Sequence, residues 1–225
     1  MVDRDRRTVR GTGRERNRFH IISLPERRPS LEKSLLRKRL LEARLAMDEA
    51  AYRQGSERIC RHLESLPRLA EAGCVHTFWP MIARREPDIR PFIEQLVSRS
   101  VRLALPVLRS PAVAEPGAPR MNQVAYGHGT RLITSSWGID EPEGEMFVSR
   151  RELDAVIVPA LGVDPAGYRI GYGLGYYDEF LSEVNATLVC PIFSRCLIDR
   201  VPLSPHDVPV HFIVTEDGVL EARKM

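Results

Sequence analysis

Short apolar segments alternate with helix-like patterns along most of this 225-residue chain. Segments at residues 74–79, 101–107, 155–158, 187–193 and 212–215 have the length and composition of buried strands. Apolar side chains recur at helical spacing over residues 31–47, in the stretch that follows Asp48, and over residues 88–97 and 176–184. Ser30 and Asp48 are placed to cap the first two helices, and residues 124–133 suit a strand pair. This alternation predicts an α/β fold: a three-layer α/β/α arrangement with a largely parallel central sheet.

Composition limits the class of protein further. Hydrophobic residues make up 43% and charged residues 28%, which excludes collagen-like, coiled-coil and wholly disordered chains. No stretch approaches the roughly 20 apolar residues that span a bilayer, so we expect no membrane partner. The four cysteines form no CxxC pair and no metal-finger spacing, and no signal peptide precedes them. We therefore expect reduced thiols in a cytoplasmic protein.

The net charge of +3 is unevenly placed. Residues 1–30 contain nine arginines and four acidic residues, a balance that could favour nucleic acid or an acidic partner. The low apolar content of this stretch favours a disordered extension, so we do not expect a nucleic-acid partner. We find no repeat and no linker in the remainder. The predicted organisation is a basic leader, residues 1–30, and a single α/β domain, residues 31–225.

The residues that carry chemistry lie between a predicted strand and a predicted helix. Gly171, Gly173 and Gly175 alternate with larger residues, so backbone amides there can approach a ligand without obstruction by side chains. Successive amides in such a turn bind anions, and the N-terminus of the next helix adds partial positive charge. Arg169 adds a full positive charge before the turn. Asp178, one helical turn inside, is placed to hold Mg²⁺ beside bound phosphates.

The spacing of this glycine-rich turn matches neither GxxxxGK[ST] nor GxGxxG. Two interpretations therefore stay open on the residues alone. One is a nucleotide site. The other is a tight structural turn that leads into a buried helix rich in tyrosine.

The segment GYRIGYGLGYYDEFL, residues 167–181, resembles the signature of the 5-formyltetrahydrofolate cyclo-ligase (5,10-methenyltetrahydrofolate synthetase) family, commonly GxRLGxGxGYYD. The resemblance extends over nearly all of residues 31–225 through an ordered set of shorter motifs. These are Lys33-SLL-Arg37, FWP at 78–80, EPD at 86–88, LALPVL at 103–108, WGIDEP at 137–142, VPALGVDPAG at 158–167, VPLSPHDVP at 201–209 and FIVTEDG at 212–218.

The resemblance implies a reaction. Enzymes of this family convert 5-formyltetrahydrofolate, ATP and magnesium to 5,10-methenyltetrahydrofolate, ADP and phosphate. The formyl oxygen is a poor leaving group, so ATP phosphorylates it to give an iminophosphate, and N10 then attacks the activated carbon. Such an enzyme needs a grip on the triphosphate, a metal, and a pocket that holds the pterin in line with the γ-phosphate.

The resemblance also implies the roles of particular residues. ATP is expected to contact two cations of the first helix and the glycine-rich turn: Lys33, Arg37, Arg169, Gly171, Tyr172, Gly173, Leu174, Gly175, Tyr176 and Tyr177. Among these, Arg169 and Tyr176 are the catalytic candidates. The expected folate contacts are Trp79, Glu86, Tyr172 and Tyr176, because an aromatic ring can lie against the pterin and a carboxylate can bond its ring nitrogens. Asp178 and Asp207 are the expected magnesium ligands.

Three positions differ from the common family pattern. Leu174 stands where Gly or Lys is common, Cys196 where Gln is usual, and His211 where Asp is frequent. Two other functions therefore stay open: a family paralogue that activates a different formamide-like substrate with ATP, and a nucleotide-binding protein without catalytic activity. We expect a small-molecule folate as partner and a monomer or homodimer.

Overall fold

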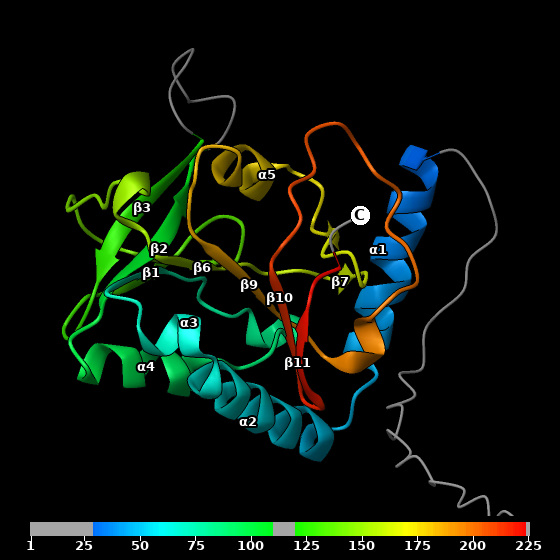
Figure 1. Ribbon diagram of the computed structural model, residues 1–225, viewed down its shortest axis with the longest axis horizontal. Helices are drawn as coiled ribbons and strands as arrows, with labels where there is room; N and C mark the ends of the chain where they lie inside the picture. The colour runs from blue at the N-terminus through cyan, green and yellow to red at the C-terminus, as the bar shows by residue number, and fades with distance from the viewer. Residues whose placement is uncertain (1–28, 110–119, 224–225) are drawn as a thin grey trace, which may run out of the picture.

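The computed structural model describes residues 29–109 and 120–223. Its main sheet has seven strands in the order β11-β10-β9-β6-β1-β2-β3 (Figure 1). The bounds are β1 Cys74–His76, β2 Arg102–Leu108, β3 Met121–Tyr126, β6 Ala155–Ile157, β9 Thr187–Pro191, β10 Phe212–Thr215 and β11 Gly218–Glu221. The five central strands are parallel, and β3 and β11 pair antiparallel at the two edges. The predicted α/β fold with a largely parallel sheet is confirmed.

Helices cover both faces of this sheet. Figure 1 shows α2 (Glu49–Ser65), α3 (Pro67–Ala70) and α4 (Arg90–Ser98) together on one side and α5 (Tyr176–Leu181) on the other. The side chains of each central strand alternate between two apolar clusters, as the period of a strand requires. In β6, Ala155 and Ile157 pack in the cluster of α2, α3 and α4, whereas Val156 packs in the cluster of α1 (Pro29–Leu45) and α5.

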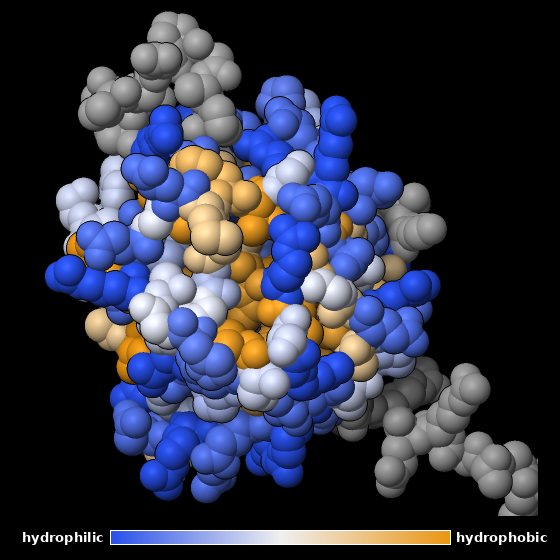
Figure 2. Space-filling view, turned by 90° about the vertical axis from the view of Figure 1, so that its left-hand side faces the viewer, coloured by the Kyte–Doolittle hydropathy of each residue, from blue (hydrophilic) through white to orange (hydrophobic). Residues whose placement is uncertain are grey.

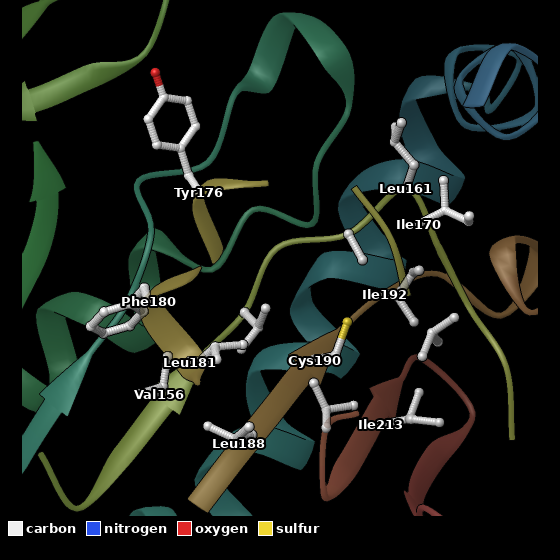
Figure 3. Packing of buried hydrophobic residues seen from close by; sticks show 14 of the residues in the cluster. Val156, Leu161, Ile170, Tyr176, Phe180, Leu181, Leu188, Cys190, Ile192 and Ile213 are labelled. Carbon is white, nitrogen blue, oxygen red and sulfur yellow. The ribbon is translucent and has the colours of Figure 1, made fainter. Parts of the chain in front are cut away.

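Packing against this second face fixes the position of α5. Phe180 and Leu181 are buried and lie beside Val156 of β6 in Figure 3. The ring of Tyr176 belongs to the same cluster, but its hydroxyl points away from the other labelled side chains. The apolar side of α5 therefore holds the helix on the sheet and leaves its first turn at the end of the glycine-rich segment.

The structure corrects one of the two predicted caps. Asp48 caps α2 as predicted, because its side chain accepts a hydrogen bond of 2.7 Å from the amide of Ala51. Helix α1 begins at Pro29, so Ser30 lies within its first turn and does not precede it. Proline suits that first position, where the backbone has no helical acceptor for an amide hydrogen. Apart from residues 29 and 30, the predicted basic leader lies outside the described residues.

Two predicted elements differ in the structure. Residues 124–133 do not form one strand pair: β3 pairs with β2, while β4 (Leu132–Thr134) pairs with β5 (Asp140–Pro142). Met121 and Val124 of β3 are buried beside β2, and this tertiary burial favours pairing with β2 over a local hairpin. Helix α5 ends at Leu181 and not at residue 184, because the amides of Glu183 and Val184 bond carbonyls three residues back in a tighter turn.

The sequence patterns missed several short elements. These are β5, the two-residue strands β7 (Gly162–Val163) and β8 (Arg169–Ile170), the edge strand β11, and the 3₁₀ turns η1 (Ile82–Arg84), η2 (Arg150–Glu152) and η3 (Ser194–Cys196). Elements of two to four residues show no measurable period. In the part of the chain that the structure describes, no helix has the length and apolar character needed to cross a bilayer.

The β3 edge of the sheet is partly covered by the segment around Phe147. The amide of Ala125 donates to the carbonyl of Met146, and the amide of Val148 donates to that of Gln123. Met146 and Phe147 remain 76% and 59% exposed. Figure 2 views the molecule from this side and shows apolar surface in the middle of the face, with charged side chains around it. The added segment blocks part of an edge that could otherwise pair with another strand.

The cap of α2 gives a first test. Asp48→Ala should lower the free energy of unfolding by about 1 kcal/mol, because the amide of Ala51 loses its acceptor. Asp48→Asn keeps an acceptor oxygen and should stay close to the wild type. Urea denaturation measures both changes. Equal stability of the two variants would contradict a capping role for Asp48.

Candidate active site

A cavity of about 540 Å³ opens at the carboxyl ends of the parallel strands. Phe78 and Trp79 follow β1, Leu108 ends β2, and Pro159 follows β6, and all four line it. The chain leaves β1 through α4 on one face of the sheet and leaves β6 through α5 on the other. Neighbouring connections that diverge in this way leave a crevice at the ends of the strands, which is the usual ligand site of an open α/β sheet.

Every residue that the sequence singled out for ATP, folate or magnesium lines this cavity. They come from α1, the loop after β1, the glycine-rich turn, α5 and the loop before β10: Lys33, Arg37, Trp79, Glu86, Arg169, Gly171, Tyr172, Gly173, Leu174, Gly175, Tyr176, Tyr177, Asp178 and Asp207. Residues up to 174 positions apart in the sequence thus meet at one site. Their individual roles stay predictions.

Helix α1 supplies cations to one side of the cavity. The Nζ atom of Lys33 lies 2.8 Å from Oδ2 of Asp207 and 2.8 Å from Oγ of Ser204. One turn later, Nε of Arg37 donates a 3.0 Å hydrogen bond to the carbonyl of Gly171. Spacing of four residues places both side chains on one face of the helix, so α1 anchors the glycine-rich turn and the loop before β10 at once.

The glycine-rich turn needs glycine at two positions. Gly173 and Gly175 have φ of +97° and +73°, in the left-handed region that other residues rarely adopt. A Cβ atom on Gly173 would also lie 2.9 Å from the guanidinium carbon of Arg37. Leu174 between them is 46% exposed, and its carbonyl accepts a hydrogen bond from Arg120. The turn therefore keeps its backbone close to the cationic side chain of α1.

Arg169 joins the turn to the other loops of the site. The residue is 8% exposed, and its Nη2 atom donates a 2.7 Å hydrogen bond to Oδ1 of Asp178. Its Nη1 atom donates to the carbonyl of Val208. A guanidinium with these two partners cannot swing freely, so its charge is fixed beside the turn and the first turn of α5.

The two tyrosines that begin α5 point in different directions. The Tyr176 hydroxyl donates a 3.0 Å hydrogen bond to the carbonyl of Arg109, and the guanidinium of Arg120 lies 4.9 Å from the ring centre. The ring of Tyr177 meets His76 edge-on at 5.9 Å. Its hydroxyl is buried and makes no hydrogen bond with the described residues, and burial raises the pKa of Tyr177. Only the first of these hydroxyls is thus held in a fixed direction.

The opposite end of the cavity is aromatic and holds a buried carboxylate. Trp79 packs against Tyr126 with ring centres 5.6 Å apart. Glu86 is 2% exposed; its Oε2 accepts a hydrogen bond from the amide of Met81, and its Oε1 accepts one from the hydroxyl of Tyr172. Burial raises the pKa of Glu86, and the nearby charge of Arg44 opposes this effect.

The predicted magnesium ligands are each paired with a cation. Asp178 pairs with Arg169, and Asp207 pairs with Lys33. The amide of Val208, next to Asp207, lies 3.4 Å from Oδ1 of Asp178, so the backbone beside Asp207 meets the carboxylate of Asp178. Over residues 29–109 and 120–223, no three His, Cys, Asp or Glu side chains converge as a metal cage. The assignment of Asp178 and Asp207 to a magnesium ion stays a prediction.

Among the residues of the site that the sequence patterns missed are Arg44, Ser204 and Trp137. Arg44 is 1% exposed beneath the cavity, and Ser204 and Trp137 line it. Arg44 lies seven residues after Arg37, on the same face of α1, and this spacing of cations on an otherwise apolar face was the available signal. Trp137 lies in the WGIDEP motif quoted above, but the motif did not assign it a role.

Two of the three departures from the family pattern lie away from the cavity. Cys196 is fully buried in the core beside α1. The Nδ1 atom of His211 accepts a hydrogen bond from the amide of Leu188, on the neighbouring strand β9. Neither residue lines the cavity; of the three departures, Leu174 alone does. The departures therefore alter the core and the sheet more than the ligand site.

Comparison with known proteins gives a consistent result. Residues 29–216 match the model of the 5-formyltetrahydrofolate cyclo-ligase family. A 5-formyltetrahydrofolate cyclo-ligase of Mycolicibacterium smegmatis is 30% identical over 196 residues, which cover 85% of this chain and 97% of that protein. The enzyme of the same name from Escherichia coli K12 is 29% identical over 141 residues, which cover 60% of this chain and 75% of that protein.

Solved structures agree with these sequence matches. The NMR structure of 5,10-methenyltetrahydrofolate synthetase from Aquifex aeolicus superposes with a TM-score of 0.72 at 29% identity, covering 86% of this chain and 94% of that one. A 5,10-methenyltetrahydrofolate synthetase from Mycoplasma pneumoniae has the same fold, with a TM-score of 0.64 at 19% identity, over 82% of this chain and 99% of that one.

The contacts of Lys33 give a test of how α1 anchors the loop before β10. Lys33→Met removes the cation that pairs with Asp207, so the amide of Ser204, which donates to the same carboxylate, should exchange its hydrogen about tenfold faster. Lys38→Met on the same helix is the control, because Lys38 is exposed and only reaches Glu42 at 4.0 Å. Equal exchange rates in the two variants, measured by hydrogen–deuterium exchange, would contradict the anchor.

Proposed function

The chain belongs to the 5-formyltetrahydrofolate cyclo-ligase family, and on this premise we propose that it converts 5-formyltetrahydrofolate, ATP and Mg²⁺ to 5,10-methenyltetrahydrofolate, ADP and phosphate. The protein is a ligase, as its relatives are. One observation carries the proposal: a single cavity joins the cations and glycine-rich turn at one end to Trp79 and Glu86 at the other. A site of this form suits a reaction between a nucleotide phosphate and a flat, apolar heterocycle.

The chemistry proceeds in two bond exchanges. First, the formyl oxygen attacks the γ-phosphorus, the bond from this phosphorus to the β–γ bridging oxygen breaks, and ADP leaves. Second, the N10 lone pair attacks the formyl carbon, N10 loses its proton to solvent, and the bond from this carbon to the phosphorylated oxygen breaks to release phosphate. Ring closure leaves the five-membered methenyl ring with its positive charge. Phosphorylation thus turns a poor leaving group into a good one.

The chain contributes charge and position to the first exchange. Lys33, Arg37 and Arg169 place three cations on one side of the cavity, where they can neutralise charge that develops on the transferred phosphoryl group. The backbone amides of the glycine-rich turn can donate to phosphate oxygens, because no side chain intervenes at Gly173 or Gly175. Asp178 and Asp207 would hold Mg²⁺, which when bound neutralises charge on the triphosphate.

At the other end, Trp79 and Glu86 orient the folate. The ring of Trp79 offers a flat apolar surface, and the carboxylate of Glu86 can accept hydrogen bonds from the N–H groups of the pterin. Tyr176 lines the cavity between the two ends.

The four cysteines support a location in the reducing cytoplasm. All of them are free, buried thiols: Cys60, Cys74, Cys190 and Cys196.

The direct test uses the purified wild-type chain with 5-formyltetrahydrofolate, ATP and Mg²⁺. We expect the near-ultraviolet absorbance of the methenyl product to grow, and this growth to require both ATP and Mg²⁺. A flat trace from a chain that still binds ATP would contradict the proposal and favour a paralogue with another formamide-like substrate.

A substitution of Arg37 tests whether the cationic end of the cavity binds the phosphates of ATP. Arg37→Ala should raise the KM for ATP about 10- to 100-fold and leave the KM for the folate nearly unchanged, because a hydrogen bond to a charged group contributes about 1.5–3 kcal/mol. Arg39→Ala is the matched control: Arg39 is an exposed arginine of the same helix that does not line the cavity. Equal loss for both substrates in Arg37→Ala would remove Arg37 from the ATP site.

A further inference from the structure

Three polar side chains form a buried chain of hydrogen bonds at the base of the cavity. The Nη2 atom of Arg44 donates to the hydroxyl oxygen of Tyr172 at 2.7 Å, and this hydroxyl donates to Oε1 of Glu86 at 2.7 Å. Arg44 and Glu86 are 1% and 2% exposed. Tyr172 comes from the glycine-rich turn, so a residue expected beside ATP sends its hydroxyl to the carboxylate at the folate end.

The remaining donors of Arg44 fix its guanidinium. Its Nε atom donates to the carbonyl of Arg84 at 2.7 Å, and its Nη1 atom donates to the carbonyl of Ala160 at 3.2 Å. The group therefore bonds three segments that are distant in the sequence: the 3₁₀ turn η1, the loop after β6 and the glycine-rich turn. A planar guanidinium held at three points has one orientation, and Tyr172 receives its hydrogen bond from a fixed direction.

Glu86 is held equally firmly. Its Oε2 atom accepts a 2.8 Å hydrogen bond from the amide of Met81, and its backbone carbonyl accepts one from the hydroxyl of Tyr52. Each carboxylate oxygen can accept a second hydrogen bond, so the group can still bind a donor in the cavity that it lines.

The charge state of Glu86 depends on the groups around it. Burial raises its pKa, and four groups oppose the rise: in decreasing order the charge of Arg44, the amide of Met81, the hydroxyl of Tyr172 and the charge of Arg84. The buried hydroxyl of Tyr177 also faces it but carries no charge at neutral pH. Arg44 is thus the main group that favours the ionised carboxylate.

We propose that Arg44 and Tyr172 are positioning residues for the folate: they hold Glu86 ionised and oriented so that it accepts hydrogen bonds from the N–H groups of the pterin. This inference rests on the proposed function. Tyr172 would then have two roles. Its backbone lies with the phosphate-binding amides of the glycine-rich turn, and its side chain orients the carboxylate that binds the folate. Helix α1 would likewise contribute to both ends of the cavity, to the phosphate end through Arg37 and to the folate end through Arg44.

The sign of the pH dependence follows from the chemistry of Glu86. A protonated carboxyl offers fewer acceptor sites, so folate affinity falls as the pH drops through the pKa of Glu86. Removal of Arg44 raises this pKa further, so the loss of affinity should begin at a higher pH. Tyr172→Phe removes one hydrogen bond to the carboxylate and should move the profile in the same direction, but less.

The experiment compares Arg44→Met, Arg44→Lys and Tyr172→Phe in the full chain. Both tryptophans of the chain, Trp79 and Trp137, line the cavity, so their fluorescence can follow titration with 5-formyltetrahydrofolate or with ATP. Titrations from about pH 5.5 to 9 give a profile of folate affinity for each variant. Tyr52→Phe is the matched control, because it removes a buried hydroxyl that bonds the backbone of Glu86 and not its carboxylate.

In Arg44→Met we expect folate to bind about tenfold more weakly at neutral pH, and the profile to move up by about one pH unit. Arg44→Lys keeps the charge and should restore most of the profile, while Tyr172→Phe should weaken folate about threefold to tenfold. ATP affinity should change by less than about twofold in all three, and Tyr52→Phe should keep the wild-type profile. If Arg44→Met does not fold, Tyr172→Phe decides the question: wild-type folate affinity and an unchanged profile in that variant would contradict the inference.

Two results would overturn this inference. One is wild-type folate affinity with an unchanged pH profile in both Arg44→Met and Tyr172→Phe. The other is a loss of ATP affinity as large as the loss of folate affinity, which would place Tyr172 at the phosphates. A wild-type chain that binds ATP but no 5-formyltetrahydrofolate would instead contradict the proposed function, and the inference with it.

Discussion

The cationic face of α1 is the constraint on which the rest of the site depends. Lys33, Arg37 and Arg44 lie on one side of this helix and bond the loop before β10, the glycine-rich turn, the loop after β6 and η1. All four segments contribute residues to the lining of the cavity. Because Leu36 and Leu40 of α1 are buried in the same apolar cluster as one face of the sheet, the helix transmits the rigidity of the core to the loops that surround the cavity.

This arrangement explains how one cavity can serve two unlike substrates. At one end, Lys33, Arg37 and Arg169 line the cavity and are held by hydrogen bonds to the protein. At the other end, Glu86 is removed from water, which raises the pKa of its carboxyl, and the charge of Arg44 opposes this rise. The glycine-rich turn lies between the two ends and contacts both through Arg37 and Tyr172. Fixed charges of this kind need little reorganisation during a phosphoryl transfer.

The sequence predicted the fold class and the set of site residues better than it predicted local detail. Buried strands such as Ala155–Ile157 are recognisable because an unbroken apolar run has few other structures open to it. The pairing of β3 with β2 was missed, since it depends on tertiary burial across a long connection. The motif located Glu86 and Tyr172, but it did not show that Arg44 joins them: the spacing of Arg44 from Arg37 places both on one face of α1, whereas the hydrogen bond to Tyr172 depends on a segment 128 residues away. The paired state of Asp178 and Asp207 likewise depends on contacts between distant segments.

The central claim is that the γ-phosphate of ATP and the formyl oxygen of the folate meet in this one cavity. The most direct measurement follows that oxygen. 5-Formyltetrahydrofolate labelled with ¹⁸O in the formyl group is converted by the wild-type chain with ATP and Mg²⁺, and the released phosphate is examined by ³¹P NMR. The account predicts that the label appears in the phosphate, one atom for each methenyl product formed. Unlabelled phosphate, with the ¹⁸O recovered in water, would contradict it.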